Sequence, residues 1–246
     1  FVTAGDPGLE ATVPVMHALV AAGADVIELG VPFSDPMADG PSIQRSSERA
    51  IGRGAGLRYV LRCVSEFRGH DTDSPVVLMG YLNPIEILGA EAFARDAAAA
   101  GVDGVLLVDL PPEEAGPTRE AFNAAGLDLI SLAAPTTAGP RLARLAAESQ
   151  GYLYYVSFAG VTGGSQLDIA DVSRRAGDLR QRATVPVLVG FGIRDAASAA
   201  ALGPVADGVV VGSALVDAVS GAGTPEDAGR RAGAFLAPLR RALDGA

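Results

Sequence analysis

Short runs of apolar residues alternate along this chain with longer, Ala-rich stretches that carry polar residues at helical spacing. The short runs are rich in Val, Ile and Leu, and such runs predict strands that are buried on both faces. We expect strands at residues 1–5, 25–32, 75–81, 104–110, 127–134, 151–157, 186–192 and 207–213. The stretches between them predict helices at residues 9–23, 41–68, 84–100, 112–125, 138–149, 168–183, 195–203 and 225–243.

This alternation indicates an α/β fold. Strands that are apolar on both faces and joined by crossover helices are typical of a parallel sheet. Because the βα unit recurs about eight times within 246 residues, the pattern favours a closed (β/α)8 barrel, or TIM barrel, over a doubly wound sheet. The chain has no linker or low-complexity tract, so we expect a single barrel domain over residues 1–246.

Composition narrows the class of partner. Nineteen basic residues against 29 acidic residues give a net charge of −10, which argues against nucleic acid or an anionic membrane as a partner. The one cysteine, Cys63, lies in an apolar helical run and predicts a buried, reduced thiol in a cytoplasmic protein. No apolar run is long enough to span a membrane and no leader is evident. The chain opens inside a strand-like run, so we expect that residues preceding it are missing.

Two carboxylates lie where a barrel places its chemistry, at the carboxyl ends of the strands. Glu28 stands late in the second strand among apolar neighbours, where a carboxylate is costly unless it is satisfied by loop amides or takes part in chemistry. Asp39 follows in the loop 31–41 and is either a functional carboxylate or the N-cap of the next helix. With no cluster of His or Cys nearby, this pair predicts general acid/base chemistry.

Four other polar residues receive structural interpretations. Asp35, between Ser34 and Pro36, is interpreted as a turn residue. Asp109, at the end of the fourth strand, is expected to hydrogen-bond neighbouring loops. The histidines, His17 and His70, are expected to have packing or surface roles away from the mouth of the barrel.

Glycines mark the ends of the last three strands. They occur in "FAGVTGGS" (158–165), "GFGIRD" (190–195) and "GSALV" (212–216), the last at the start of a short predicted helix. Glycine lets main-chain N–H groups approach a ligand closely, and the loops after strands seven and eight often bind phosphate in barrels. Because "GVTGGS" and "VVVGSALV" lack Lys and Arg, main-chain amides would hold the anion. The pattern predicts an enzyme for a phosphorylated small molecule.

Several motifs together resemble those of the tryptophan synthase alpha chain family, in order and over nearly the whole chain. The motifs are "FVTAGDPG", "ADVIELGVPFSDPMADGPSIQ", "LMGYLNPI", "LLVDLPPEE", "YYVSFAGVTG", "VGFGI" and "VVVGSALV". The run "ELGVPFSDPMADGP" is highly specific to the family. The resemblance begins at the first strand, so we expect that the N-terminal helix that precedes this strand in the family lies outside this sequence.

The resemblance implies a lyase that cleaves indole-3-glycerol phosphate to indole and glyceraldehyde 3-phosphate, with no cofactor or metal on this chain. Glu28 matches the family's acid/base and Asp39 the carboxylate that holds the indole N–H, while Tyr154 matches a tyrosine beside the glutamate. The resemblance also implies a tryptophan synthase beta chain as partner, in an alpha2-beta2 complex. That beta chain carries pyridoxal phosphate.

The resemblance also assigns substrate- and phosphate-binding positions: Phe1, Tyr81, Thr162, Gly163, Phe191, Gly192, Gly212 and Ser213. Phe158 stands where some members carry Arg, so that Arg's loop contact is not expected here. Loops 31–41 and 158–168 have the composition of mobile lids. An apolar setting would raise the pKa of Glu28, and Asp39, on a more polar loop, would stay ionised.

Three other functions remain open at this point. One is a different phosphate-binding barrel, such as an isomerase of phosphorylated sugars. The second is a free-standing lyase that releases indole without a beta chain. The third is a chain retained mainly as an activating partner of the beta chain, against which the intact Glu28, Asp39 and Tyr154 argue.

Overall fold

The structure is a computed structural model, and it describes residues 1–137, 139–156, 169–190 and 192–245, of which 169–171 are described by their backbone alone. The chain forms two compact units. Unit 1 consists of Phe1–Asp128 with Ser213–Ala237, and unit 2 of Leu129–Gly212 with Pro238–Ala246. The expectation of a single domain over the whole chain stays a prediction.

Eight strands are present, at the positions that the apolar runs predict. They are β1 (Val2–Thr3), β2 (Ile27–Gly30), β3 (Val76–Gly80), β4 (Gly104–Leu107), β5 (Asp128–Ala133), β6 (Leu153–Val156), β7 (Val187–Gly190) and β8 (Gly208–Val210). In unit 1, β1 to β4 pair in parallel in chain order, and in unit 2, β5 to β8 do the same. The predicted (β/α)8 class is therefore confirmed in element order and strand direction, with each strand shorter than its apolar run.

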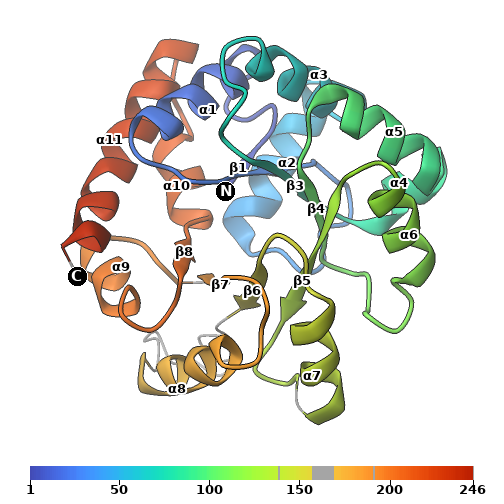
Figure 1. Ribbon diagram of the computed structural model, residues 1–246. Helices are drawn as coiled ribbons and strands as arrows, with labels where there is room; N and C mark the ends of the chain where they lie inside the picture. Colours follow the sequence, from blue (N-terminus) through green and yellow to red (C-terminus); the bar gives the residue numbers. More distant parts are fainter. Residues whose placement is uncertain (138, 157–168, 191, 246) are drawn as a thin grey trace. The chain divides into compact units, whose positions relative to one another are not determined.

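Helices follow the strands (Figure 1). They are η1 (Leu9–Ala11), α1 (Thr12–Ala21), α2 (Pro41–Gly52), α3 (Leu57–Arg68), α4 (Leu82–Leu88), α5 (Ala90–Ala100), α6 (Gly116–Ala124), α7 (Gly139–Glu148), α8 (Ile169–Arg180), α9 (Ala196–Leu202), α10 (Ser213–Val219) and α11 (Pro225–Asp244).

Two helices predicted as continuous are each divided in two. The stretch 41–68 breaks between α2 and α3, where Gly54 has a φ of +87°. The stretch 84–100 breaks at Gly89, which has a φ of +91° and separates α4 from α5. A positive φ interrupts a right-handed helix, and glycine adopts it without the penalty that a Cβ would bring. The prediction of single helices was wrong at these two places.

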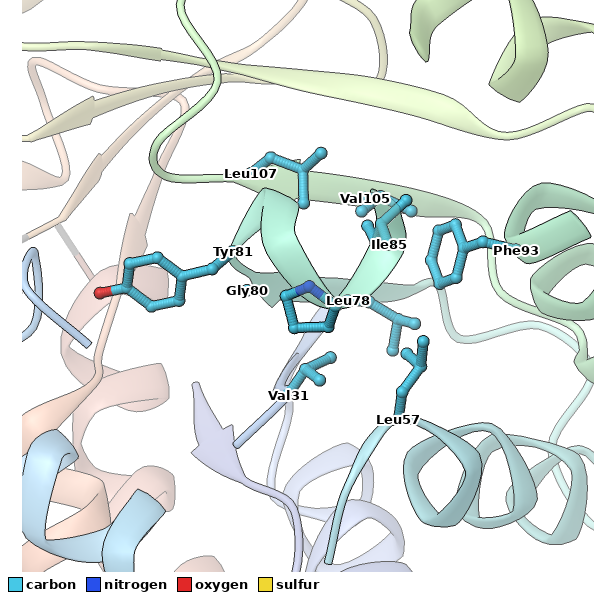
Figure 2. A pocket seen from close by; sticks show the side chains of 10 residues that line it. Val31, Leu57, Leu78, Gly80, Tyr81, Ile85, Phe93, Val105 and Leu107 are labelled. Atoms are coloured by element: carbon cyan, nitrogen blue, oxygen red, sulfur yellow. The ribbon is translucent and has the colours of Figure 1, made fainter. Parts of the chain in front are cut away.

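In unit 1 the strands alternate between two buried faces. Leu29 pairs with Leu78, and Leu78 pairs with Val105, which places these side chains on one face. Helix α1 packs against β2, and α1, α3, α5 and α6 pack against one another in that order, as Figure 1 shows. Figure 2 shows the apolar cluster formed there around the first turn of α4, with Val31, Leu57, Leu78, Ile85, Phe93, Val105 and Leu107.

Helix α2 is fixed to the end of β1 by polar contacts. The Thr3 and Ser46 hydroxyls lie 2.6 Å apart and both residues are buried. The Arg49 guanidinium donates to both oxygens of the buried Asp6 carboxylate, at 2.8 and 2.6 Å, and Arg53 adds a longer contact at 3.4 Å. A bidentate pair of this kind fixes direction as well as distance. The helix that follows the Asp39 loop therefore has a rigid attachment.

Unit 2 is built from β5 to β8 with α7, α8 and α9. Its strand pairs are parallel, with Tyr154 opposite Leu188 and Leu188 opposite Gly208. Helix α8 packs on β7 and α9, and α9 packs on β8. Arg180 of α8 pairs with Asp207 at 2.8 Å, and that carboxylate also accepts the Val187 N–H that begins β7.

Candidate active site

Glu28 is buried in β2, with 4% of its surface exposed. Side chains alternate along a strand, so Glu28 shares a face with Gly30 and lies opposite the face of Ile27 and Leu29. Its partner in the neighbouring strand is Val77. The sequence prediction that this carboxylate is buried among apolar residues is confirmed.

A small pocket lies at the end of this face in unit 1. Gly30, Met79, Tyr81, Phe1 and Asp39 contribute to its lining, with Val31, Ile43, Ser47, Gly80 and Val108. Glu28 precedes Gly30 by two residues, which places it about 6–7 Å along the strand from that position. The carboxylate therefore belongs to the strand face that leads into this pocket.

Gly30 makes room for the Phe1 ring. A Cβ atom at position 30 would stand 2.5 Å from Phe1 Cζ and 2.8 Å from Cε2. No side chain fits at that distance, so the ring lies against the bare backbone of β2. The structure thus places two residues predicted from the sequence, Phe1 and Glu28, on one face of β2.

Asp39 and Tyr81 meet across 42 residues of chain. The Tyr81 hydroxyl donates to Asp39 Oδ2 at 3.1 Å and accepts the Ala38 N–H at 3.0 Å. The Tyr81 ring also stacks on Phe33, with the centroids 5.1 Å apart. In Figure 2 this ring points away from the apolar cluster behind β3. Tyr81 therefore holds the loop 31–40 at three of its residues.

Burial sets the charge behaviour of this pair. It raises the pKa of Asp39, and the hydrogen bond from Tyr81 opposes that rise. Burial, with the negative charge of Asp39, raises the pKa of Tyr81 well above its ordinary range, so that hydroxyl remains a donor. The sequence expectation of a more polar setting for Asp39 was incomplete, because the loop half-buries the carboxylate.

The alternative function of Asp39 as a helix cap is wrong. The N-cap of α2 is Gly40, and no side chain caps it. Asp35 is exposed and accepts the Ser34 hydroxyl at 2.5 Å, while its carbonyl accepts the Met37 N–H at 2.8 Å, in agreement with a turn role.

The remaining interpretations of single polar residues are confirmed. Asp109 Oδ1 accepts the Leu82 N–H at 2.8 Å, so it fixes the start of α4 directly after Tyr81. The His17 ring packs on Phe67, with centroids 4.6 Å apart, and on His70.

Cys63 is buried and forms no disulfide. Among the described residues, no three His, Cys, Asp or Glu side chains gather as a metal site would require.

Tyr154 occupies the corresponding place in unit 2. It is buried in β6, and a Cβ atom at Gly190 of β7 would stand 2.0 Å from its hydroxyl oxygen and 2.3 Å from Cζ. The phenol ring therefore lies over Gly190, the last residue of β7. As with Phe1 and Gly30, an aromatic ring covers a glycine at the carboxyl end of the next strand.

The predicted phosphate positions are described only in part. Gly192 has a φ of +81°, and Gly212 directly precedes α10, which begins at Ser213. Thr162, Gly163 and Phe191 lie outside the described residues, as do Phe158 and the predicted lid 158–168. The prediction that main-chain amides hold the phosphate stays a prediction.

Sequence reasoning missed the residues that support these side chains. Gly30 and Gly190 could have been found, because each lies inside an apolar run that predicts a strand, where a glycine often marks the close approach of another group. Phe33, Gln44 and the Asp6–Arg49 pair carry no local signal, because single polar or aromatic residues in a loop or on a helix usually face solvent.

Comparison with known proteins supplies the family context. The family model described as tryptophan synthase alpha chain matches residues 1–241. A tryptophan synthase alpha chain from Xanthomonas euvesicatoria is 71% identical over 245 residues, which cover 99% of this chain and 91% of that protein. One from Xylella fastidiosa is 68% identical over 244 residues, covering 99% and 91%.

Solved structures agree with these sequence matches. The tryptophan synthase subunit alpha from Legionella pneumophila has a TM-score of 0.92 at 45% identity, covering 100% of this chain and 91% of that one. A chain from the tryptophan synthase a2b2 complex of Pyrococcus furiosus has a TM-score of 0.84 at 37% identity, covering 97% and 94%. The similarity extends over nearly the whole chain in each case.

Proposed function

The chain belongs to the tryptophan synthase alpha chain family, and from this premise we propose how its residues perform the family's reaction. The reaction is the cleavage of indole-3-glycerol phosphate to indole and glyceraldehyde 3-phosphate in tryptophan biosynthesis, and the enzyme is a carbon–carbon lyase. The observation that carries the proposal is the pair of carboxylates in unlike settings, Glu28 buried in a strand and Asp39 bonded to Tyr81.

Glu28 is the proposed acid and base. It delivers a proton to C3 of the indole ring, which makes the ring an electron acceptor for the C3–glycerol bond. As that bond breaks, its electron pair returns to the ring and the adjacent glycerol hydroxyl loses its proton to become the aldehyde. One proton is given and one is taken, so a single carboxyl group serves both steps.

Asp39 is the proposed partner of the ring nitrogen. Protonation at C3 leaves positive charge at the indole N–H, and a carboxylate that accepts this hydrogen bond stabilises that charge. The role requires the ionised form, which the Tyr81 hydroxyl favours by donating to Oδ2. Tyr81 and Phe1 line the same pocket and are proposed to contact the indole.

Residues of the second half of the chain are proposed to hold the rest of the substrate. Tyr154 is proposed to line the site near the glycerol portion. Main-chain amides are proposed to bind the phosphate, at Thr162, Gly163, Gly192, Gly212 and Ser213, and the aromatic group of Phe191 is proposed to lie near the ligand. We propose no cofactor or metal on this chain, with pyridoxal phosphate on the partner chain.

A tryptophan synthase beta chain is the proposed partner, in an alpha2-beta2 complex. One solved relative is part of an a2b2 complex. In this chain the two most exposed large apolar side chains of the described residues are Met37, at 87%, and Ile87, at 81%. Met37 lies in the Asp39 loop and Ile87 on the helix that begins after Tyr81. We propose that these two segments contact the beta chain.

The proposed location is the cytoplasm. Cys63, the single cysteine, is buried and unbridged, as is usual in a reducing compartment. No helix in the described part of the chain is both long and apolar enough to cross a bilayer.

The test is indole release from indole-3-glycerol phosphate by the purified chain, alone and with a tryptophan synthase beta chain. We expect slow release alone and a strong increase in the mixture. Equal release in both would favour a free-standing lyase, and no release in either would contradict the proposal. The matched family and the relatives above give no support to an isomerase of phosphorylated sugars.

The partner surface has its own test. Ile87→Glu should reduce the increase caused by the beta chain and leave the release by the isolated chain unchanged. Ile51→Glu is the control, because Ile51 is only 38% exposed and lies on α2. An undiminished increase with Ile87→Glu would remove α4 from the proposed contact.

A further inference from the structure

Gln44 bridges the segment that carries Asp39. Its side-chain amide nitrogen donates to the Asp39 carbonyl oxygen at 2.8 Å and lies 3.4 Å from the Pro36 carbonyl oxygen. The Asp39 N–H donates to that same Pro36 oxygen at 3.0 Å, which closes a turn over residues 36–39. One side chain thus holds both ends of the turn.

The helix that carries Gln44 cannot easily move. Three residues of α2 attach it to other parts of unit 1: Ser46 contacts Thr3, Arg49 donates to the buried Asp6, and Ser42 donates to Asp217 of α10 at 2.9 Å. The turn is therefore attached to an element that is fixed on β1 and α10.

The Asp39 side chain has a second fixed contact, the Tyr81 hydroxyl. The Tyr81 hydroxyl contacts Asp39 Oδ2 and the N–H of Ala38. Neither contact involves the main chain of Asp39. The Gln44 amide supplies that contact. Together the two define both the backbone position and the direction of the carboxylate.

We propose that Gln44 is a positioning residue for Asp39, and that it acts by donating from its side-chain amide to the main-chain carbonyl of Asp39. The inference rests on the proposed function of Asp39. Its consequence is that loss of the amide donor lowers the chemical rate without weakening substrate binding in proportion, because the charge that Asp39 stabilises develops during the reaction.

The test uses Gln44→Met, which keeps the length and removes the donor, and Gln44→Glu, which keeps the shape and sets a carboxylate against two carbonyl oxygens. Gln181→Met is the matched control, since Gln181 is exposed and beyond the end of α8. Indole release is measured with the beta chain present, and unfolding is followed by urea titration.

We expect kcat to fall about 10- to 100-fold in both Gln44 variants, in the range that a small misplacement of a reacting group produces. KM should change less than about threefold, and the urea midpoint should fall only slightly, because Gln44 is exposed to solvent. An unchanged kcat would overturn the inference, as would activity kept by Gln44→Glu and lost in Gln44→Met, because that pattern does not follow the donor.

A second background separates this inference from the proposed function. Gln44→Met should cause no further loss when Asp39 is already Asn, because its effect passes through that carboxylate. An added loss in that background would show a general structural role and overturn the inference. If Asp39→Asn itself retains the wild-type rate, the proposed role of Asp39 fails, whatever Gln44 does.

Discussion

In both units an aromatic ring covers a glycine at the carboxyl end of a strand, but the residues near the two rings differ. In unit 1 the Phe1 ring covers Gly30 of β2, and in unit 2 the Tyr154 ring covers Gly190 of β7. Phe1 lines the pocket to which Asp39 and Tyr81 also contribute, and the buried Glu28 lies on the same face of β2 as Gly30. Tyr154 lies between the apolar partners Leu132 of β5 and Leu188 of β7, and its ring covers the glycine that ends β7.

The difference between the two units corresponds to two requirements of the proposed reaction, a fixed carboxylate and a binding site for phosphate. A carboxylate that moves protons must be held at a fixed place, and buried hydrogen bonds provide that constraint. A phosphate held by main-chain amides needs close approach of the backbone, which glycine permits. Under the proposed function, Glu28 of unit 1 is the first kind of residue, and Gly192 and Gly212 of unit 2, with Ser213, are the second. The predictions below test this division.

The largest effect is expected from Glu28→Gln. The amide cannot take and return the proton, so kcat should fall about 10²- to 10⁴-fold while substrate binding is kept. Stability should not fall, because a neutral group replaces a buried carboxylate. Indole release and calorimetric titration with substrate measure the two quantities. Glu91→Gln, on the exposed side of α5, is the control, and a rate within tenfold of wild type would contradict the assignment.

The next effect concerns stability in unit 1. Arg49→Met should lower the free energy of unfolding by about 2–3 kcal/mol, somewhat less than for a fully buried pair, because Arg49 is partly exposed and Arg53 remains near Asp6. Urea titration measures it. The matched change in unit 2, Arg144→Met, removes a surface pair on α7 and should cost less than about 0.5 kcal/mol. Equal costs would contradict the difference between the two units.

Gly190→Ala should disturb Tyr154. The new methyl group would overlap the phenol ring, so we expect a cost of about 1–3 kcal/mol and a fall in kcat of about tenfold as the hydroxyl moves. Gly177→Ala is the control, since a Cβ there meets open space on α8 and should be neutral or slightly stabilising. When Tyr154 is already Ala, Gly190→Ala should lower the free energy of unfolding only slightly. An undiminished loss of stability in that background would show that overlap with the Tyr154 ring does not cause the effect.

A smaller effect is expected on the pH profile. Tyr81→Phe removes the hydrogen bond that favours ionised Asp39, so the pKa of Asp39 rises further and the acid limb of the kcat profile moves to higher pH. A limb that stays in place, or moves to lower pH, would contradict the pairing. Loss of one hydrogen bond should also cost about 0.5–1.5 kcal/mol of stability.

The same raised pKa has a consequence for stability. Because the folded pKa of Asp39 lies above the unfolded value of about 3.9, the folded state binds more protons. The contribution of Asp39 is then most favourable below that unfolded pKa and is lost as the pH rises through the folded pKa. Asp39 therefore lowers stability at neutral pH, where function requires its charge.

The sequence was sufficient for the framework and for part of the site. Continuous apolar runs predicted all eight strands, and Glu28 stood out because a carboxylate inside such a run is unusual. The helix breaks at Gly54 and Gly89 were missed, because apolar residues at helical spacing occur on both sides of these glycines and favour one continuous helix.

What could not be predicted depends on contacts that are distant along the chain. The sequence favoured a functional Asp39 but left a helix cap open, and the hydrogen bond from Tyr81, 42 residues away, could not be predicted from it. Arg49 donates hydrogen bonds to Asp6, which lies 43 residues away along the chain. The sequence around either residue looks the same as that around a charged residue exposed to solvent. Long-range polar pairs of this kind leave no periodic signal.

The central claim is that two carboxylates in unlike settings share the cleavage of indole-3-glycerol phosphate. The most direct measurement is the rate of indole release by Asp39→Asn beside the wild-type chain, with saturating substrate and an added beta chain. The account predicts at least a 100-fold lower rate in a chain that is no less stable to urea at neutral pH. A near wild-type rate would contradict it, because the charge on the ring nitrogen would then need no carboxylate at position 39.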